Sequence, residues 1–230
     1  MKNGTIPPFP CSLILSGRSG SGKTNLLINL LHPDSNLLYG NYYHYILVFS
    51  PTASNLDDLY ESLKIPPENF KATYTKNDLQ EIIDTRKAMI NELGLEEVGK
   101  KHRMLIIMDD IIASRSFLQS EEALQMFVLL RHYYISVIVN TQSMTKIPRA
   151  LRVNSNALFI FLSNLNEKEI LKDELTPPNM TKKEFSKVID YATDEPYSFI
   201  YINNKEMDQN KRFRKNLDEI IDLDKFRTNK

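Results

Sequence analysis

The stretch LILSGRSGSGKTNLLINLL, residues 13–31, places three glycines within six positions, between an apolar run and a leucine-rich one. Its centre, Gly17 to Thr24, matches the phosphate-binding pattern G-x-x-x-x-G-K-[ST]. The apolar run before it predicts a strand, and the leucines after it predict a helix, which is the context that this pattern requires. The sequence therefore predicts a loop that binds the phosphates of a nucleotide.

Each position of this loop has a physical role. The glycines let the backbone fold around a triphosphate with successive N–H groups pointing inward, and the following helix adds the positive end of its dipole. Lys23 would reach the β- and γ-phosphates of ATP, and the Thr24 hydroxyl would ligate Mg²⁺. The alternative is a flexible Gly/Ser turn, but the flanking elements favour nucleotide binding. The expected phosphate-binding residues are Gly17, Arg18, Ser19, Gly20, Ser21, Gly22, Lys23 and Thr24.

Short apolar runs alternate with longer helical patterns along most of the chain. This alternation predicts an α/β fold with a mostly parallel sheet and helices on both faces. The expected strands are Cys11–Ser16, Tyr45–Ser50, Met104–Asp109, Ser136–Thr141, Ala157–Leu162 and Tyr197–Ile202. The expected helices are Thr24–Leu31, Leu56–Leu63, Asn77–Leu93, Ser120–Tyr133, Glu167–Glu174 and Lys182–Ala192.

Length and composition favour one globular domain. The 230 residues are expected to form one domain around the phosphate-binding loop, with a core at about 10–165 and C-terminal helices, a strand and a tail at 166–230. No apolar run reaches the roughly 18 residues of a membrane span. The N-terminus carries one Lys and several prolines, so we expect a soluble protein that is not secreted. Cys11 is the only cysteine, which excludes an intrachain disulfide and fits a reducing compartment.

The segment RMLIIMDD ends a second buried strand with paired acids. Asp109 would hold Mg²⁺ through water, and Asp110 would accept a proton from, or orient, the water that attacks the γ-phosphate, which favours hydrolysis. In P-loop ATPases with an additional strand, the strand that follows the paired acids in sequence lies in the sheet between the strand of the phosphate loop and the strand of the acids. The polar end of ISVIVNTQS would therefore face the γ-phosphate. Gln142, at this end of the strand, would sense the bound nucleotide. The alternative for Asp109 and Asp110 is a pair of acids in a turn or at a helix cap, and the alternative for Gln142 is an amide in a solvent-facing loop.

The segments GRSGSGKT, MLIIMDD and LRHYYISVIVNTQSMTKIPRALRVNSNALFIF together resemble the poxvirus-type genome-packaging ATPases of large DNA viruses and virophages. These belong to the FtsK/HerA group of DNA-pumping motors. The resemblance covers about residues 10–165 and extends weakly through YATDEPYSFIYIN. It implies a RecA/FtsK-like core that uses ATP and Mg²⁺, with Lys23, Asp110 and Gln142 as catalytic residues and Thr24 and Asp109 at the metal.

The same resemblance implies partners and a place of action. It implies double-stranded DNA as the translocated substrate, a homo-oligomeric ring that is pentameric or hexameric, and capsid portal or vertex proteins as partners. The expected location is the cytoplasm of an infected host cell, at the virus factory, or the virion. Asp110 stands where FtsK and HerA usually have Glu, and the DNA-orienting domain of FtsK has no expected counterpart. How the chain engages DNA is therefore open.

The resemblance further implies an arginine finger, which stabilises the transition state in a neighbouring subunit. Arg152 is the first candidate because it follows the Gln142 strand through IPRALR, Arg149 is the second and Arg131 the third. The alternative for Arg152 is a pairing with a nearby acid or with a DNA phosphate.

Charge does not identify a DNA-binding surface, because 29 Lys and Arg balance 29 Asp and Glu. The clusters KKHR at 100–103 and NKRFRKN at 210–216 have a composition suited to phosphate contact, although each alone is better explained as a solvated loop. Two other functions stay open, a small-molecule kinase and a nucleotide-dependent switch or scaffold. The segment TKND at 75–78 matches a guanine-reading pattern, and we interpret it instead as a helix start.

Overall fold

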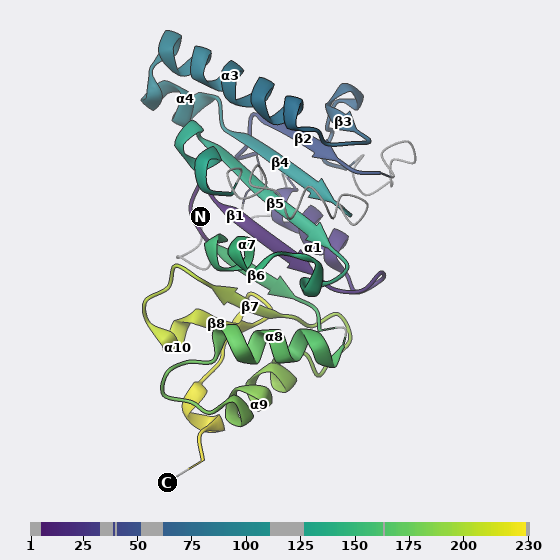
Figure 1. Ribbon diagram of the computed structural model, residues 1–230, viewed down its shortest axis with the longest axis vertical. Helices are drawn as coiled ribbons and strands as arrows, with labels where there is room; N and C mark the ends of the chain where they lie inside the picture. Colours follow the sequence, from purple (N-terminus) through teal and green to yellow (C-terminus); the bar gives the residue numbers. More distant parts are fainter. Residues whose placement is uncertain are drawn as a thin grey trace.

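The fold is built on a nine-stranded sheet, with its helices on both faces (Figure 1). The computed structural model describes residues 6–32, 39, 41–51, 62–110, 127–162 and 164–228. The strands are β1 Ser12–Ser16, β2 Tyr45–Phe49, β3 Phe70–Lys71, β4 Met104–Asp109, β5 Ile135–Thr141, β6 Ala157–Ile160, β7 Ile200–Asn203, β8 Phe213–Lys215 and β9 Glu219–Ile220. The α-helices are α1 Lys23–Leu31, α3 Lys76–Leu93, α4 Leu95–Lys101, α7 Arg149–Asn154, α8 Leu165–Leu175, α9 Lys182–Ala192 and α10 Gln209–Arg212.

The strand order is β3-β2-β4-β5-β1-β6-β7-β8-β9. Strands β1 to β6 pair in parallel, and β7, β8 and β9 add to the β6 edge as antiparallel strands. The predicted mostly parallel α/β sheet is therefore confirmed. Strand β5 lies between β4 and β1, as expected for the additional strand, so the ends of these three strands meet at one edge of the sheet.

Two apolar layers cover the sheet because successive side chains of a strand point to opposite faces. In β1, Leu13 and Leu15 pack with Leu27 of α1, whereas Ile14 belongs to the core on the other face. That second core includes residues of α8 and α9 and of the short 3₁₀ helices η3 Leu130–Tyr133 and η4 Met144–Lys146. The buried strands hold the phosphate loop and the polar strand ends on a rigid platform.

Helix starts follow local capping chemistry. Thr75 caps α3, where its Oγ1 accepts from the Asp78 N–H at 3.3 Å and the Asp78 carboxylate accepts from the Thr75 N–H at 2.8 Å. The segment 75–78 thus begins a helix, as interpreted from the sequence, although the cap is Thr75 and not the expected Asn77 or Asp78. Thr181 and Glu184 form the same box at the start of α9.

Some expected elements differ from the structure. The expected strand Tyr197–Ile202 begins at Ile200, because Tyr197 lies in a turn. Most of the expected helix Leu56–Leu63 and the first part of Ser120–Tyr133 fall outside the described residues, and Leu130–Tyr133 forms a 3₁₀ turn. None of the helices in the described ranges is long and apolar enough to cross a membrane.

Candidate nucleotide-binding site

The phosphate loop connects β1 to α1 and depends on glycine at two positions. Gly22 precedes α1 with a φ of 99°, a left-handed conformation that costs any other residue energy. Gly17 has an ordinary φ but no room, because a Cβ there would lie 2.6 Å from the Cβ of Phe161. The loop can therefore fold back over the start of α1 only with glycine at these positions.

Lys23 is the first residue of α1, and its side chain crosses the phosphate loop. The Lys23 Nζ donates to the Arg18 carbonyl oxygen at 3.0 Å. Burial lowers the pKa of the Lys23 ammonium, while the charges of Asp109, Asp110 and Glu167 act in the opposite direction. A phosphate group beside this amine would favour its charged form, which is the role expected of the lysine in such a loop.

The polar ends of β4 and β5 lie side by side and are joined by hydrogen bonds. Asn140 donates from Nδ2 to Asp109 Oδ1 at 2.6 Å. Asp110 follows with a φ of 48°, and its backbone N–H donates to the Asn140 carbonyl at 3.0 Å. Gln142 then donates from Nε2 to both oxygens of Asp110, at 3.1 and 2.9 Å. The two acids thus have separate partners, one amide for each carboxylate.

The phosphate loop and the strand ends enclose a cavity of about 550 Å³. Most of the predicted site residues line it, and Arg18 and Ser21 line a smaller neighbouring cavity. The residues around the larger cavity are Ser19, Gly20, Gly22, Lys23, Thr24, Asn25, Asp109, Asp110, Asn140, Thr141, Gln142 and Tyr197. The structure therefore brings together the loop and the paired acids that are separate in the sequence.

The side chains at this cavity fit Mg²⁺ and a triphosphate. Mg²⁺ retains several waters and is usually held by one or two carboxylates together with substrate phosphates. Thr24 and Asp109 offer a hydroxyl and a carboxylate at the cavity. Within the described ranges, the Asn140 Oδ1 is buried without a hydrogen-bond partner, so it is an acceptor suited to a water on the metal. No cluster of three His, Cys, Asp or Glu side chains suited to a metal occurs in these ranges, and this mode of binding needs none.

Arg152, the first candidate for an arginine finger, is engaged within its own subunit. Its side chain is only 9% exposed and forms a two-pronged ion pair with Glu174 of α8, with Nε 2.9 Å from Oε2. A further guanidinium nitrogen donates to the backbone carbonyls of Met144 and Ile147. To reach a neighbouring subunit, this guanidinium would have to leave all of these partners. The pairing with a nearby acid, the alternative for Arg152, is what the structure contains.

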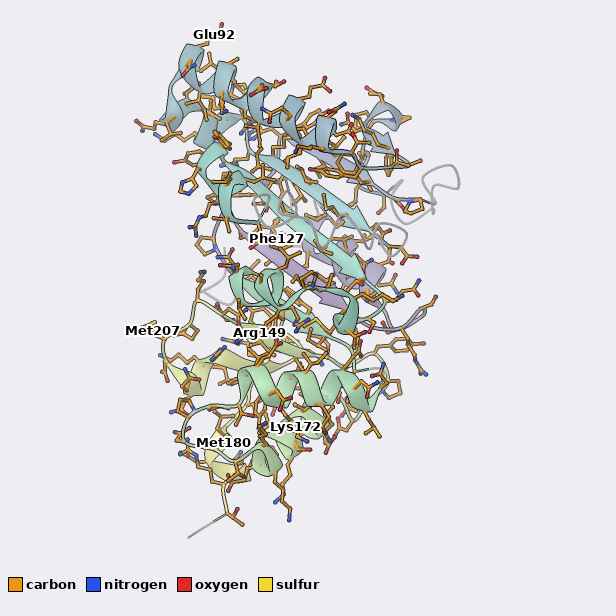
Figure 2. All side chains as sticks on the ribbon, viewed as in Figure 1. Glu92, Phe127, Arg149, Lys172, Met180 and Met207 are labelled. Carbon is orange, nitrogen blue, oxygen red and sulfur yellow. The ribbon has the colours of Figure 1, made fainter. Side chains whose placement is uncertain are left out.

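Arg149 and Arg131 are the other finger candidates, and both are exposed. The Arg149 side chain is 72% exposed, lies between α7 and α8 (Figure 2), and has its Nε 3.8 Å from Glu174 Oε1. Arg131 is exposed in η3. Neither belongs to the described lining of the cavity, so either one would have to act on the site of another subunit.

The two basic clusters are largely paired within the chain. Lys100 and Lys101 form ion pairs with glutamates one turn earlier in α4. In the second cluster, Phe213 is fully buried and Lys215 is paired with Asp194 and Glu195. Phe213 and Lys215 are therefore structural residues and do not present a surface for DNA phosphates.

Sequence reasoning missed several residues around the site. Glu174 and Lys215 act through partners about twenty residues away in the sequence, and no local pattern marks such pairs. The backbone N–H of Met144 donates to the buried Glu167 carboxylate at 2.9 Å, which a sequence likewise does not reveal. Tyr197 lines the cavity from a turn, and the Pro before it is the one available signal.

Comparison with known proteins identifies the family. The sequence profile described as Poxvirus A32 protein matches residues 6–218, which is most of the chain. The chain belongs to the poxvirus A32 protein family. A relative of this A32 family chain in Invertebrate iridescent virus 6, the uncharacterized protein 075L, is 23% identical over 197 residues, which cover 85% of this chain and 71% of the relative.

Solved structures confirm the fold of this A32 family member. It matches the genome packaging NTPase B204 of Sulfolobus turreted icosahedral virus 2, in complex with AMP, with a TM-score of 0.57 and 14% identity over 87% of this chain and 94% of that one. It also matches B204 of Sulfolobus Turreted Icosahedral Virus, a DNA-packaging ATPase, with a TM-score of 0.55 and 14% identity over 84% and 92%. At these identities the likeness establishes the fold, which is that of P-loop packaging ATPases. The predicted resemblance to viral packaging ATPases is confirmed.

Proposed function

We propose that this poxvirus A32 family protein is an ATP-hydrolysing motor that translocates double-stranded DNA and packages a viral genome into its capsid. The packaging class follows the family match, and one observation supports hydrolysis: Gln142 holds both carboxylate oxygens of Asp110 at the cavity that Lys23 also lines. A carboxylate fixed by an amide at the end of the strand beside the phosphate loop suits the activation of water, as hydrolysis requires.

The chain's residues divide the reaction among them. The phosphate loop and Lys23 bind the β- and γ-phosphates, and Asp110 takes a proton from the attacking water. The water oxygen bonds to the γ-phosphorus as the bond to the bridging oxygen breaks, which yields ADP and phosphate. Thr24 and Asp109 would hold Mg²⁺, which when bound screens the negative charge of the phosphates. Gln142 orients Asp110 and senses whether the γ-phosphate is present.

A short connection runs from this sensor to α7 and α8. Two residues after Gln142, the backbone of Met144 is held by Glu167 of α8 and by Arg152 of α7. A movement of Gln142 on loss of the γ-phosphate would therefore shift the η4 segment against α7 and α8. Such a shift is how hydrolysis at the cavity would be coupled to movement of bound DNA.

We infer a homo-oligomeric ring, pentameric or hexameric, in which Arg149 of one subunit supplies the finger to the next and several copies surround the DNA. Modest charge on each subunit then suffices, because the copies converge on one channel. Capsid portal or vertex proteins are the proposed partners, in the infected cell or in the virion.

Phosphate release from Mg·ATP, measured with and without duplex DNA, tests the function. Stimulation by duplex DNA supports a motor, and Lys23→Ala is the control that should remove turnover. Transfer of phosphate to a small acceptor would instead identify a kinase. Nucleotide binding without any turnover would identify a switch or scaffold, and either of these results would overturn the proposal.

A further inference from the structure

A second cavity lies next to the phosphate cavity. It measures about 290 Å³ and shares Gly20 and Tyr197 with the larger cavity. The shared residues place the two cavities next to each other, with Tyr197 at the border between them. The lining of the second cavity is Arg18, Gly20, Ser21, Phe161, Leu162, Thr193, Glu195, Pro196, Tyr197 and Ser198.

The strand order gives a bound nucleotide a direction. Asp109 and Asp110 lie at the end of β4, on one side of β1 and its phosphate loop, and mark the end of the cavity where the γ-phosphate belongs. Strands β6 and β7 lie on the other side of β1. A nucleotide with its γ-phosphate beside Asp110 can then direct its ribose and base toward the neighbouring cavity, which Phe161 and the turn before β7 line.

Tyr197 stands at this position with its ring open to solvent. It is 72% exposed, and it packs beside the phosphate loop, because a Cβ on Gly22 would lie 3.5 Å from Tyr197 Cδ1. Tyr197 is the third residue of a turn and has a φ of 65°. The turn is closed by the Ser198 N–H, which donates to the Glu195 carbonyl at 3.1 Å. Glycine is the usual residue at such a position after proline, so a bulky aromatic residue there is under backbone strain. Strain of this kind is common at ligand-binding sites.

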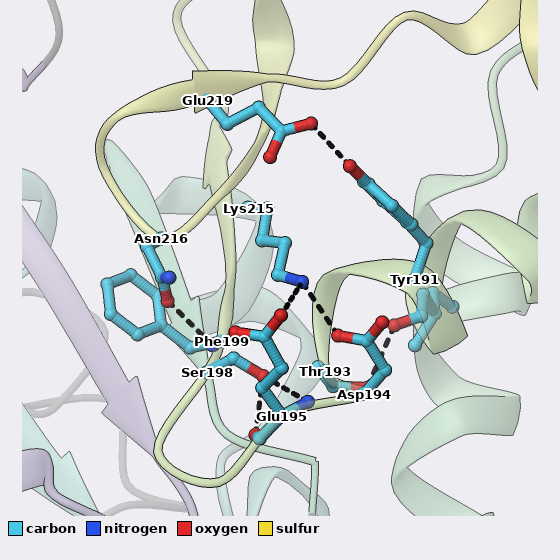
Figure 3. Close-up of polar contacts among 10 residues, drawn as sticks. Tyr191, Thr193, Asp194, Glu195, Ser198, Phe199, Lys215, Asn216 and Glu219 are labelled. Carbon is cyan, nitrogen blue, oxygen red and sulfur yellow. Dashed lines mark hydrogen bonds and ion pairs between the residues drawn. The ribbon is translucent and has the colours of Figure 1, made fainter.

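Polar contacts from the neighbouring hairpin hold this turn in place (Figure 3). Lys215 of β8 donates to Asp194 at 2.7 Å and to Glu195 at 3.1 Å. Within the turn, the Ser198 hydroxyl donates to the Glu195 carbonyl at 2.7 Å. These contacts keep the turn beside the phosphate loop, so the exposed Tyr197 ring has a defined position.

We propose that Tyr197 is the platform on which the nucleobase of a bound nucleoside triphosphate stacks. This inference rests on the proposed function, because it assumes that the phosphate cavity binds a triphosphate. Stacking tolerates any base, since every base has a π-face, so the ring contributes to the binding of ATP and GTP alike. As an uncharged ring it adds no ion pair to the phosphate chain, so its effect should depend on the presence of a base.

Equilibrium binding of three probes, each with Mg²⁺, tests the proposal: ATP, GTP and inorganic tripolyphosphate. Tyr197→Gly removes the ring and accepts the positive φ without strain, and Tyr197→Phe is the matched control that keeps the ring. We expect Tyr197→Gly to weaken the binding of ATP and GTP by about tenfold or more, which is the usual effect of removing a stacking ring. The affinity for tripolyphosphate should not change. Tyr197→Phe should bind all three as the wild type does.

A spectroscopic readout is also available, because the chain contains no tryptophan. In a Tyr197→Trp variant, ATP and GTP should change the fluorescence of the new ring, and tripolyphosphate should not. The proposal is overturned if Tyr197→Gly binds ATP as tightly as the wild type. It is also overturned if the variant loses affinity for ATP and for tripolyphosphate by the same factor, since the ring then has no role specific to the base. If the wild type binds none of the three probes, the proposed function fails as well.

Discussion

Gln142 donates from its amide nitrogen to both carboxylate oxygens of Asp110, at 3.1 and 2.9 Å, and so joins the ends of β5 and β4. The neighbouring carboxylate, Asp109, is held by a different amide, that of Asn140. The two acids are therefore fixed separately, which allows one to serve the metal and the other the water. This separation makes their roles testable by substitution.

Asp110→Asn should keep Mg·ATP binding and lose hydrolysis by at least about 100-fold, because the amide cannot accept the proton of the attacking water. Asp109→Asn, the matched control, should instead raise the Mg²⁺ concentration needed for turnover. Calorimetric binding of ATP and phosphate-release rates measure the two effects. If both variants hydrolyse ATP normally, the assignment of the acids is wrong.

Arg152→Ala should destabilise the fold rather than act between subunits. The change leaves Glu174 partly buried without its guanidinium partner and frees the carbonyls of Met144 and Ile147. Removing one member of a buried ion pair costs about 3–5 kcal/mol of unfolding free energy. Arg149→Ala is the control, and its exposed side chain should be worth less than about 0.5 kcal/mol. Equal urea stability of the two variants would contradict this interpretation of Arg152.

Arg149→Ala should lower turnover by about 10³-fold or more if Arg149 is the finger, with little change in ATP binding. Mixing inactive Arg149→Ala subunits with inactive Lys23→Ala subunits should recover partial activity, because an intact site can form between one subunit of each kind. Arg131→Ala, mixed in the same way, is the comparison. Mixed oligomers that form but remain inactive would exclude Arg149 as a residue that acts across the interface.

Glu184 should make stability depend on acid pH. Hydrogen bonds from the backbone of Thr181 and from Thr228 lower the pKa of its carboxyl from 4.5 to about 2. The folded state thus prefers the charged form. The resulting stability is fully present above pH 4.5 and is lost as the pH falls toward 2. Glu184→Gln should lower the melting temperature at neutral pH, and its difference from the wild type should shrink below pH 4.5. Glu169→Gln, at an exposed position, is the control. If the difference in melting temperature between Glu184→Gln and the wild type stays constant with pH, the role of the Glu184 charge is contradicted.

Local patterns predicted much of the fold. The bounds of β4 and α9 agree with the sequence, because an unbroken apolar run and a strong amphipathic period with its Thr181 cap are local signals. Strands β8 and β9 have three and two residues, too few to show any period. Their place in the sheet comes from pairing with β7, which a sequence pattern does not encode.

The site, like the fold, was predictable where its residues form a contiguous motif. The phosphate loop and the paired acids are contiguous motifs, so their residues could be named, and the expected strand order brought Gln142 to Asp110. The sequence did not reveal that Arg152 pairs with Glu174, because this partner lies 22 residues away on another helix. Tyr197 was missed because its exposure and positive φ are properties of a folded turn.

The most direct test of the central claim is displacement of a triplex-forming oligonucleotide from duplex DNA during ATP hydrolysis. A translocating motor removes the third strand as it moves along the duplex. The expected result is displacement by the wild type with ATP, none with a non-hydrolysable analogue, and none with Asp110→Asn. A wild type that hydrolyses ATP in the presence of the duplex but leaves the third strand in place would contradict the account.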